Sequence, residues 1–259
     1  MEKLTRPVIA GNWKMHKTIS EARQLAAEIV SQVASLGQGT LILIPPFTAI
    51  QEVKKTVSGS RLLVGGQDLF WEEEGAFTGE ISARQLKEAG CDIVIVGHSE
   101  RRQYFGETDE TVKKKVLAAL RHELRPIVCM GENLEERKSG ETLKKIKSQL
   151  ENSLFDLPAE DFRQVILAYE PIWAIGTGQN ATPEQAEEVH SYIRQLIDGN
   201  YGQEIAACAI ILYGGSVKPA NALSLKKEKD VDGFLVGGAS LQAESFMGLV
   251  REACRADEG

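Results

Sequence analysis

The chain has 259 residues, of which 42% are apolar and 26% charged, a balance typical of a globular protein with a sizeable core. Its formal net charge of −7 disfavours a general attraction to nucleic acid or to an anionic membrane. No apolar run approaches the roughly 20 residues that cross a bilayer, and no apolar signal region follows the first residue, so we expect a cytoplasmic protein.

Short apolar runs rich in β-branched residues alternate with helix-forming segments along the chain. Continuous apolar runs of this kind are typical of strands buried on both faces, as in parallel sheets covered by helices. Eight such runs predict strands at 8–10, 41–44, 62–64, 91–96, 126–130, 165–168, 207–212 and 231–236.

Helix signals fill the intervals between these runs. Residues 18–21 have capping-box spacing and precede apolar residues at helical period, with Gly37 as the expected stop. Residues 182–185 form a second capping box with proline at the first helical position. Further helices are predicted at 80–89, 109–123, 143–154, 218–226 and 241–253.

Eight strand–helix units without a linker rich in glycine and serine predict one domain over 1–259, built as a closed parallel (β/α)8 barrel. A doubly wound open sheet is the alternative. It is disfavoured because no G-x-G-x-x-G follows the first strand and because eight even units suit closure. In such barrels the chemistry lies at the carboxyl ends of the strands and in the loops that follow them.

Polar residues follow three of the predicted strands. Asn12 and Lys14 come after the first strand, His98 follows the fourth, and Glu170 ends the sixth just before Pro171. Each alone has an ordinary explanation: a solvated lysine, a hydrogen-bonded structural histidine, a helix-capping glutamate. Because parallel strands place all of them at one mouth of the barrel, we expect a joint catalytic site there.

Glycine pairs follow the last two predicted strands, at 214–215 and at Gly237 and Gly238. Such pairs are most often simple turns. After the last two strands of a barrel, however, they are typical of a phosphate site, because backbone N–H groups without a neighbouring Cβ approach an anion closely. Ser216 adds a hydroxyl donor beside the first pair.

The connection at 65–80 is far longer than the roughly 2–6 residues usual between a strand and a helix. It carries four large apolar side chains, Leu69, Phe70, Trp71 and Phe77. They could pack against the barrel rim, but so much aromatic surface favours an oligomer contact.

Cysteines and histidines show no metal-binding pattern. Cys91, Cys129, Cys208 and Cys254 form no Cys-x-x-Cys, and the four histidines lack the i, i+4 spacing of ligands on a helix. We therefore expect buried reduced thiols and no metal.

Five motifs taken together resemble triosephosphate isomerases, and they occur in family order along a chain of family length. They are NWKMH at 12–16, VGHSERR at 96–102, YEPIWAIGTG at 169–178, YGGSV at 213–217 and VGGAS at 236–240. The resemblance implies a TIM barrel that interconverts dihydroxyacetone phosphate and D-glyceraldehyde 3-phosphate through an enediol(ate), in glycolysis and gluconeogenesis. It also implies that no metal or organic cofactor takes part.

The resemblance also implies roles for individual residues. Glu170 matches the catalytic base, neutral His98 and Lys14 face the developing oxyanion with Asn12 as a further donor, and Glu100 is a proton relay or a partner of Lys14. The positions that match substrate contacts are Asn12, Lys14, Gly176, Ser216, Gly237 and Gly238. Residues 171–181 match a lid whose apolar tip excludes water from the base.

The family implies a homodimer in which the loop at 65–80 inserts beside the site of the second subunit. By the match of positions, Phe77, Thr78 and Glu80 lie against Asn12, Met15 and Arg101 of the partner. Two other functions remain as alternatives. One is a Schiff-base aldolase with Lys14 as nucleophile, and the other is a non-catalytic phosphosugar-binding barrel.

Overall fold

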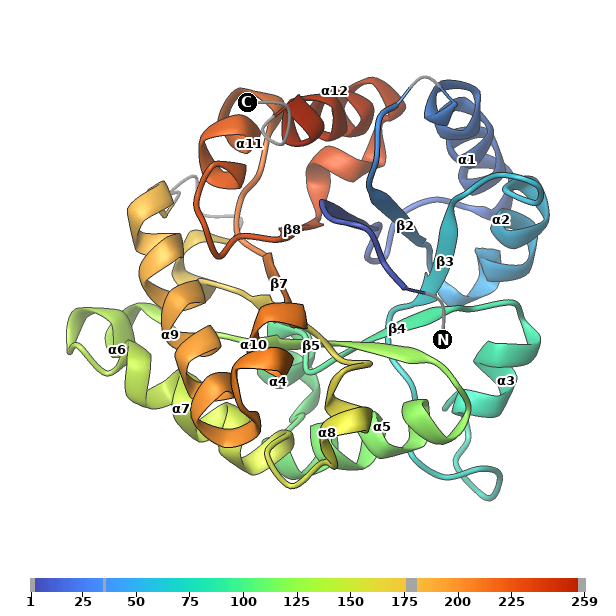
Figure 1. The fold of residues 1–259 in the computed structure, drawn as a ribbon. Helices are drawn as coiled ribbons and strands as arrows, with labels where there is room; N and C mark the ends of the chain where they lie inside the picture. Colours follow the sequence, from blue (N-terminus) through green and yellow to red (C-terminus); the bar gives the residue numbers. More distant parts are fainter. Residues whose placement is uncertain (1–2, 35, 176–180, 256–259) are drawn as a thin grey trace.

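The computed structural model describes residues 3–34, 36–175 and 181–255. In this part of the chain, eight parallel strands close into a barrel in sequence order, and helices surround it (Figure 1). The strands are β1 Val8–Asn12, β2 Thr40–Ile44, β3 Leu63–Gly66, β4 Ile93–Val96, β5 Arg125–Met130, β6 Ile166–Tyr169, β7 Ile210–Tyr213 and β8 Gly233–Val236. The predicted (β/α)8 barrel is confirmed.

Every strand is followed by at least one helical segment before the next strand or the end of the described chain. The α-helices are α1 Ile19–Val33, α2 Ile50–Thr56, α3 Ala83–Glu88, α4 Ser99–Phe105, α5 Asp109–Arg121, α6 Leu134–Lys138, α7 Thr142–Ser153, α8 Ala159–Phe162, α9 Pro183–Tyr201, α10 Gln203–Cys208, α11 Pro219–Lys226 and α12 Ala243–Arg255. Short 3-10 helices are η1 Phe47–Ala49, η2 Ile172–Ala174 and η3 Gly238–Leu241. The sequence patterns did not predict the short helices α2, α6, α8 and α10.

Several predicted boundaries are wrong by two or more residues, such as the starts of β4 at Ile93 and β8 at Gly233, and two further errors have identifiable reasons. The seventh strand was expected at 207–212 but begins at Ile210, because the alanine-rich residues before it form helix α10. Helix α1 ends at Val33, with Ala34 as its C-cap, so Gly37 is not its stop. The sequence pattern locates a short apolar run, but it does not decide whether that run forms a helix or a strand.

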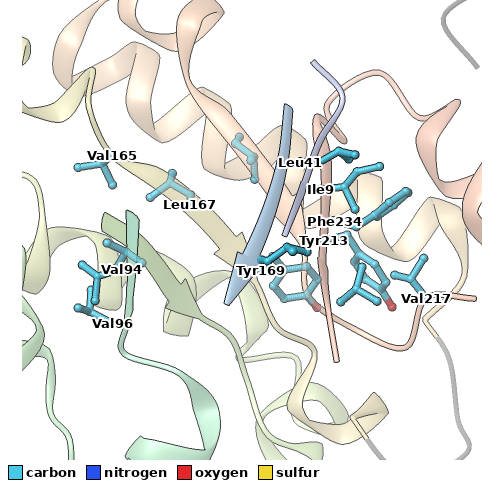
Figure 2. Packing of buried hydrophobic residues seen from close by; sticks show 14 of the residues in the cluster. Ile9, Leu41, Val94, Val96, Val165, Leu167, Tyr169, Tyr213, Val217 and Phe234 are labelled. Carbon is cyan, nitrogen blue, oxygen red and sulfur yellow. The ribbon is translucent and has the colours of Figure 1, made fainter. Parts of the chain in front are cut away.

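Alternate strand residues face opposite sides of the barrel wall. Val8, Ala10, Ile42 and Ile95 belong to a cluster inside the barrel. The outward-facing residues form a second, larger cluster beneath the helices, and Figure 2 shows some of its members. The labelled members are Ile9, Leu41, Val94, Val96, Val165, Leu167, Tyr169, Tyr213, Val217 and Phe234. Burial of each large apolar side chain contributes about 1.5–3 kcal/mol, so both faces of the wall stabilise closure.

His190 on α9 lies behind the strands β6 and β7. Its ring is fully buried, with centroids 5.9 Å from Tyr169 and 6.4 Å from Tyr213. Nδ1 lies 3.1 Å from the carbonyl oxygen of Asp230, and because a carbonyl only accepts, Nδ1 carries the proton. Burial lowers the pKa of His190 to about 4, so the ring is neutral in the folded protein near neutral pH.

We expect His190 to make the folded state sensitive to acid. Between its unfolded pKa of about 6.5 and its folded pKa of about 4, the unfolded chain binds a proton that the native protein does not. Stability that is fully present above pH 6.5 is therefore lost as pH falls through 4, by up to about 3 kcal/mol. The loss is measured by urea unfolding of wild type and His190→Gln between pH 7 and 4, at one protein concentration.

The difference between the two proteins is the informative quantity. Burial raises the pKa of Asp68 to about 6, so Asp68 changes stability in the opposite sense over the same range and cancels only in the difference. A difference in unfolding free energy that is flat from pH 4 to 7 would contradict the assignment.

Candidate active site

A cavity of about 580 Å³ opens at the carboxyl ends of the strands. Parallel pairing places those ends at one mouth, as the registers Asn12 with Ile44 and Tyr169 with Tyr213 illustrate. The cavity brings together these predicted site residues: Asn12, Lys14, His98, Glu100, Glu170, Ser216, Gly237 and Gly238. Gly176, the remaining predicted contact, lies outside the described residues.

The carboxylate of Glu170 is held at the inner wall of this cavity, 2% exposed. Its Oε2 accepts the backbone N–H of Ser99 at 2.9 Å, and its Oε1 accepts the Ser99 hydroxyl at 3.3 Å. Nε2 of His98 lies 3.1 Å from Oε1. Ser99 was not predicted as a site residue, although it lies next to His98 in the strand-end motif.

Two glycines create the space that the Glu170 residue occupies. A Cβ on Gly131 would lie 1.7 Å from the Glu170 carbonyl oxygen, and a Cβ on Gly214 would lie 2.9 Å from its Cγ. The backbone of Glu170 is fixed further by its N–H, which donates to the carbonyl of Met130 at 2.7 Å. The end of β6 and its neighbours therefore position this carboxylate closely.

His98 is the N-cap of α4, and its Nδ1 accepts the backbone N–H of Glu100 at 3.2 Å. An accepting ring nitrogen carries no proton, so the imidazole is neutral with its proton on Nε2, pointing toward Glu170. The first turn of α4 therefore imposes this tautomer.

Lys14 has an unusual backbone, with φ at +52°. The conformation is held on both sides, because its N–H donates to the Asn12 side-chain oxygen at 3.0 Å and its carbonyl accepts from the Gln67 amide at 2.8 Å. Its Nζ lies 2.6 Å from Oε1 of Glu100. Of the two roles left open for Glu100, the structure contains the pairing with Lys14. Gln67 had not been singled out, since nothing local distinguishes it within the long loop.

The opposite side of the cavity is made of backbone. Gly237 lies against the Lys14 side chain, since a Cβ there would be 3.3 Å from its Cε, and Gly238 begins the 3-10 helix η3. A Cβ on Gly215 would be 2.2 Å from the Tyr213 hydroxyl, so only glycine fits there. Ser216 follows directly and also lines the cavity. This backbone-rich side has the composition expected of an anion site.

Behind the cavity, buried Glu132 connects β6 with the segment after Glu170. Its Oε1 accepts the Tyr169 hydroxyl at 3.1 Å and the Trp173 indole N–H at 2.8 Å. Burial raises the pKa of Glu132. The predicted lid at 171–181 thus begins as the anchored 3-10 helix η2, and its residues 176–180 lie outside the described chain.

The long loop at 65–80 is partly packed on its own chain. Leu69 is buried, and the Phe70 ring lies 4.1 Å from that of Trp71 and 4.6 Å from that of Phe77. The tip remains open to solvent, with Phe77 42% exposed. The other residues predicted at the interface are the exposed Thr78, Glu80 and Met15, buried Asn12, and half-buried Arg101.

Asp68 of this loop belongs to a cluster of charges, buried except for half-buried Arg101, that the sequence did not indicate. Arg101 Nε is 2.7 Å from Asp68 and 3.2 Å from Glu107, and Lys115 Nζ contacts the same two carboxylates at 2.6 and 3.0 Å. The cluster contains two cations and two anions, so its net charge is zero. Charges removed from water need such pairing to offset the loss of their hydration.

All four cysteines are free, but only Cys91 and Cys129 are buried. Cys254 is partly exposed, and Cys208 is exposed because it lies at the end of α10 rather than in a strand, which corrects the expectation of four buried thiols. Within the described ranges, no three His, Cys, Asp or Glu side chains gather in a way that could hold a metal ion. The helices described there are also too short or too polar to cross a membrane.

Comparisons with known proteins find one family over almost the whole chain. The model of the family described as triosephosphate isomerase matches residues 7–253. The chain is 52% identical over 247 residues to a triosephosphate isomerase of Thermoanaerobacter pseudethanolicus, covering 95% of this chain and 99% of that protein. Similar relatives with that name occur in Moorella thermoacetica, at 52% identity over 247 residues, and in Trichlorobacter lovleyi, at 51% over 245 residues, each covering 95% of this chain and 98% of the relative.

Proposed function

Since the chain belongs to the triosephosphate isomerase family, we propose that the cavity at its barrel mouth interconverts dihydroxyacetone phosphate and D-glyceraldehyde 3-phosphate, with Glu170 as the base. The observation that carries this proposal is the pairing of a buried carboxylate with a neutral imidazole, with 3.1 Å between Oε1 and the protonated Nε2 of His98. Removal of a proton from the carbon next to a carbonyl requires a base for the proton and a hydrogen-bond donor for the carbonyl oxygen, and these two groups are neighbours here.

The base step starts from the hydrogen bonds now made by the Glu170 carboxylate. To reach a substrate carbon, Glu170 exchanges the Ser99 contacts for the substrate. It removes a proton from the carbon beside the carbonyl, and the electron pair moves onto the carbonyl oxygen to give an enediolate. The His98 imidazole then gives its Nε2 proton to this oxygen and takes the proton of the neighbouring hydroxyl oxygen. That second oxygen becomes the new carbonyl as the Glu170 carboxylic acid returns a proton to the former carbonyl carbon, so both side chains regain their starting protonation states.

Three donors face the oxygen that becomes negative. His98 supplies its Nε2–H, Lys14 its ammonium group, and Asn12 its side-chain amide. Loss of one such preorganised donor reduces turnover by about 10²–10³-fold in other enzymes. The pairing of Lys14 with Glu100 and the two hydrogen bonds on its backbone keep the ammonium group in place without a substrate.

We propose that the phosphate group binds on the backbone-rich side, at Ser216, Gly237 and Gly238, and that Gly176, outside the described residues, is a further contact by the match to the family. Lys14, which is paired with Glu100, and Lys218 bring two cations to this cavity in a chain of net charge −7. Such local charge is needed because the overall field repels an anionic substrate.

The same family membership supports further proposals. Residues 1–259 act as one domain that works in glycolysis and gluconeogenesis in the cytoplasm, needs no metal or organic cofactor, and functions as a homodimer through the loop at 65–80. Neither nucleic acid nor a membrane is proposed as a partner, in line with the negative net charge.

Turnover in deuterium oxide tests the proton-transfer chemistry. If Glu170 exchanges its acquired proton with solvent before returning it, product formed from dihydroxyacetone phosphate carries deuterium on carbon. Carbon-bound deuterium would exclude a direct hydride shift, whereas an unlabelled product would mean either a hydride shift or return of the proton before it exchanges. Borohydride added during turnover distinguishes the aldolase alternative, because it would reduce an imine on Lys14 and add the substrate mass to that residue. No such adduct is expected.

A further inference from the structure

Lys218 is an exposed cation that lines the candidate active-site cavity. It lies two residues after Ser216, which belongs to the proposed phosphate site, and Val217 between them packs into the outer apolar cluster. Ser216 and Lys218 thus reach the same cavity from one short segment between β7 and α11. The family motif at 213–217 ends just before this lysine, so the resemblance assigns it no role.

The pairing of charges in the cavity sets Lys218 apart. Four residues in the described lining are charged at neutral pH: Lys14, Lys218, Glu100 and Glu170. Lys14 is paired with Glu100 at 2.6 Å, whereas Lys218 has no ion-pair partner among the residues that the structure describes. Without Lys218, one cation would face two carboxylates in this lining, in a chain whose net charge is −7. An entering anion would then meet a negative cavity in a negative protein.

Helix energetics disfavour a lysine at this position. Lys218 is the N-cap of α11, where Ser, Thr, Asp and Asn are preferred because their side chains accept a backbone N–H. A lysine side chain only donates, and its charge lies at the positive end of the helix dipole. Accordingly, the Lys218 side chain makes no capping hydrogen bond. The stability of α11 therefore does not explain a cation here.

Asn221 holds the segment that carries Lys218. Its side-chain oxygen accepts the Lys218 N–H at 2.8 Å, and its amide nitrogen donates to the Ser216 carbonyl at 3.1 Å. One side chain thus fixes the backbones of Ser216 and Lys218 relative to each other. A phosphate that binds at Ser216 is consequently within reach of the lysine side chain two residues away.

We propose that Lys218 promotes capture of the substrate by attracting its phosphate group into the cavity, a role that rests on the isomerase function proposed above. A phosphate ester carries a charge of about −1.5 to −2 near pH 7, and a chain of net charge −7 repels it. An unpaired positive charge beside the phosphate site offsets this repulsion. Lys218 acts on capture and leaves the proton transfers to Glu170 and His98.

Lys218→Gln is expected to lower kcat/KM about threefold at an ionic strength of about 10 mM and to leave kcat unchanged. One charge and a dianion about 9 Å apart in water attract each other by about this factor, and salt at about 0.5 M screens most of the attraction. The difference between the two enzymes should therefore disappear at high salt. Lys218→Arg keeps the charge and should retain the wild-type kcat/KM.

Lys227→Gln is the matched control, because Lys227 is the exposed C-cap at the other end of the same helix and does not line the cavity. It removes the same charge from the chain and should leave kcat/KM unchanged. Four results would overturn the proposal: an equal loss in Lys227→Gln, no loss in Lys218→Gln, a fall in kcat as large as the fall in kcat/KM, or a loss in Lys218→Arg.

Calorimetry with inorganic phosphate separates this role from the isomerase function. At a constant low ionic strength, Lys218→Gln should raise the Kd for inorganic phosphate about two- to threefold, and Lys227→Gln should leave it unchanged. Absence of turnover by wild type would refute the isomerase function, and the phosphate titration would still decide the role of Lys218. An unchanged Kd in Lys218→Gln would overturn that role even in an active isomerase.

Discussion

Glu170→Asp is expected to lower kcat by about 10²-fold or more while leaving the binding of inorganic phosphate nearly unchanged. Removal of one methylene withdraws the carboxylate by more than 1 Å, and a displacement of about that size costs on the order of 10²-fold in rate when a base must reach one carbon. The structure makes this loss hard to recover, since the backbone of Glu170 is held by Met130 and packed against Gly131.

A coupled assay on glyceraldehyde 3-phosphate measures kcat, and calorimetry with inorganic phosphate measures binding. Glu151→Asp on α7 is a matched control, the same substitution at an exposed site outside the cavity, and should leave both quantities unchanged. Because the phosphate end does not contact residue 170 in the proposed mode, a loss of binding as large as the loss of kcat would indicate a misfolded site. Equal turnover by wild type and Glu170→Asp would show that Glu170 is not the base.

Phe77→Asp is expected to give a monomer with nearly no turnover. The Phe77 side chain is 42% exposed at the tip of the loop at 65–80, beside the exposed Thr78, and we propose that a second subunit covers it. A charge there must lose its hydration for the subunits to associate, which strongly disfavours contact. In the proposed dimer, the partner's tip supports Lys14 and His98, so the separated subunit loses their positions.

Leu134→Asp on α6 is the matched control, because Leu134 is 43% exposed and its change also places a carboxylate on an apolar surface position. Light scattering across a range of protein concentrations gives the mass, and turnover is measured on the same samples. A fully active Phe77→Asp monomer would remove the need for a second subunit, and a Phe77→Asp dimer would place the interface elsewhere.

The sequence alone was sufficient for the barrel and for the common location of the main site residues. Eight apolar runs separated by helical patterns require burial on both faces, and closure in sequence order satisfies that requirement. Because parallel strands share one carboxyl mouth, Asn12, Lys14, His98 and Glu170 had to meet once the fold was known. This inference needs only periodicity and strand direction, which short stretches of sequence carry.

The tertiary structure decided which atoms meet within that mouth. Three hydrogen bonds illustrate this: Ser99 donates to Glu170, the Glu100 N–H fixes the tautomer of His98, and Gln67 donates to the carbonyl of Lys14. Each depends on the positions of individual atoms. Likewise, Arg101 and Lys115 join the loop at 65–80 to α4 and α5 through their ion pairs with Asp68. Hydrogen bonds and charge clusters depend on distances of a few ångströms between distant parts of the chain, and local propensity and hydrophobic period carry no information about them.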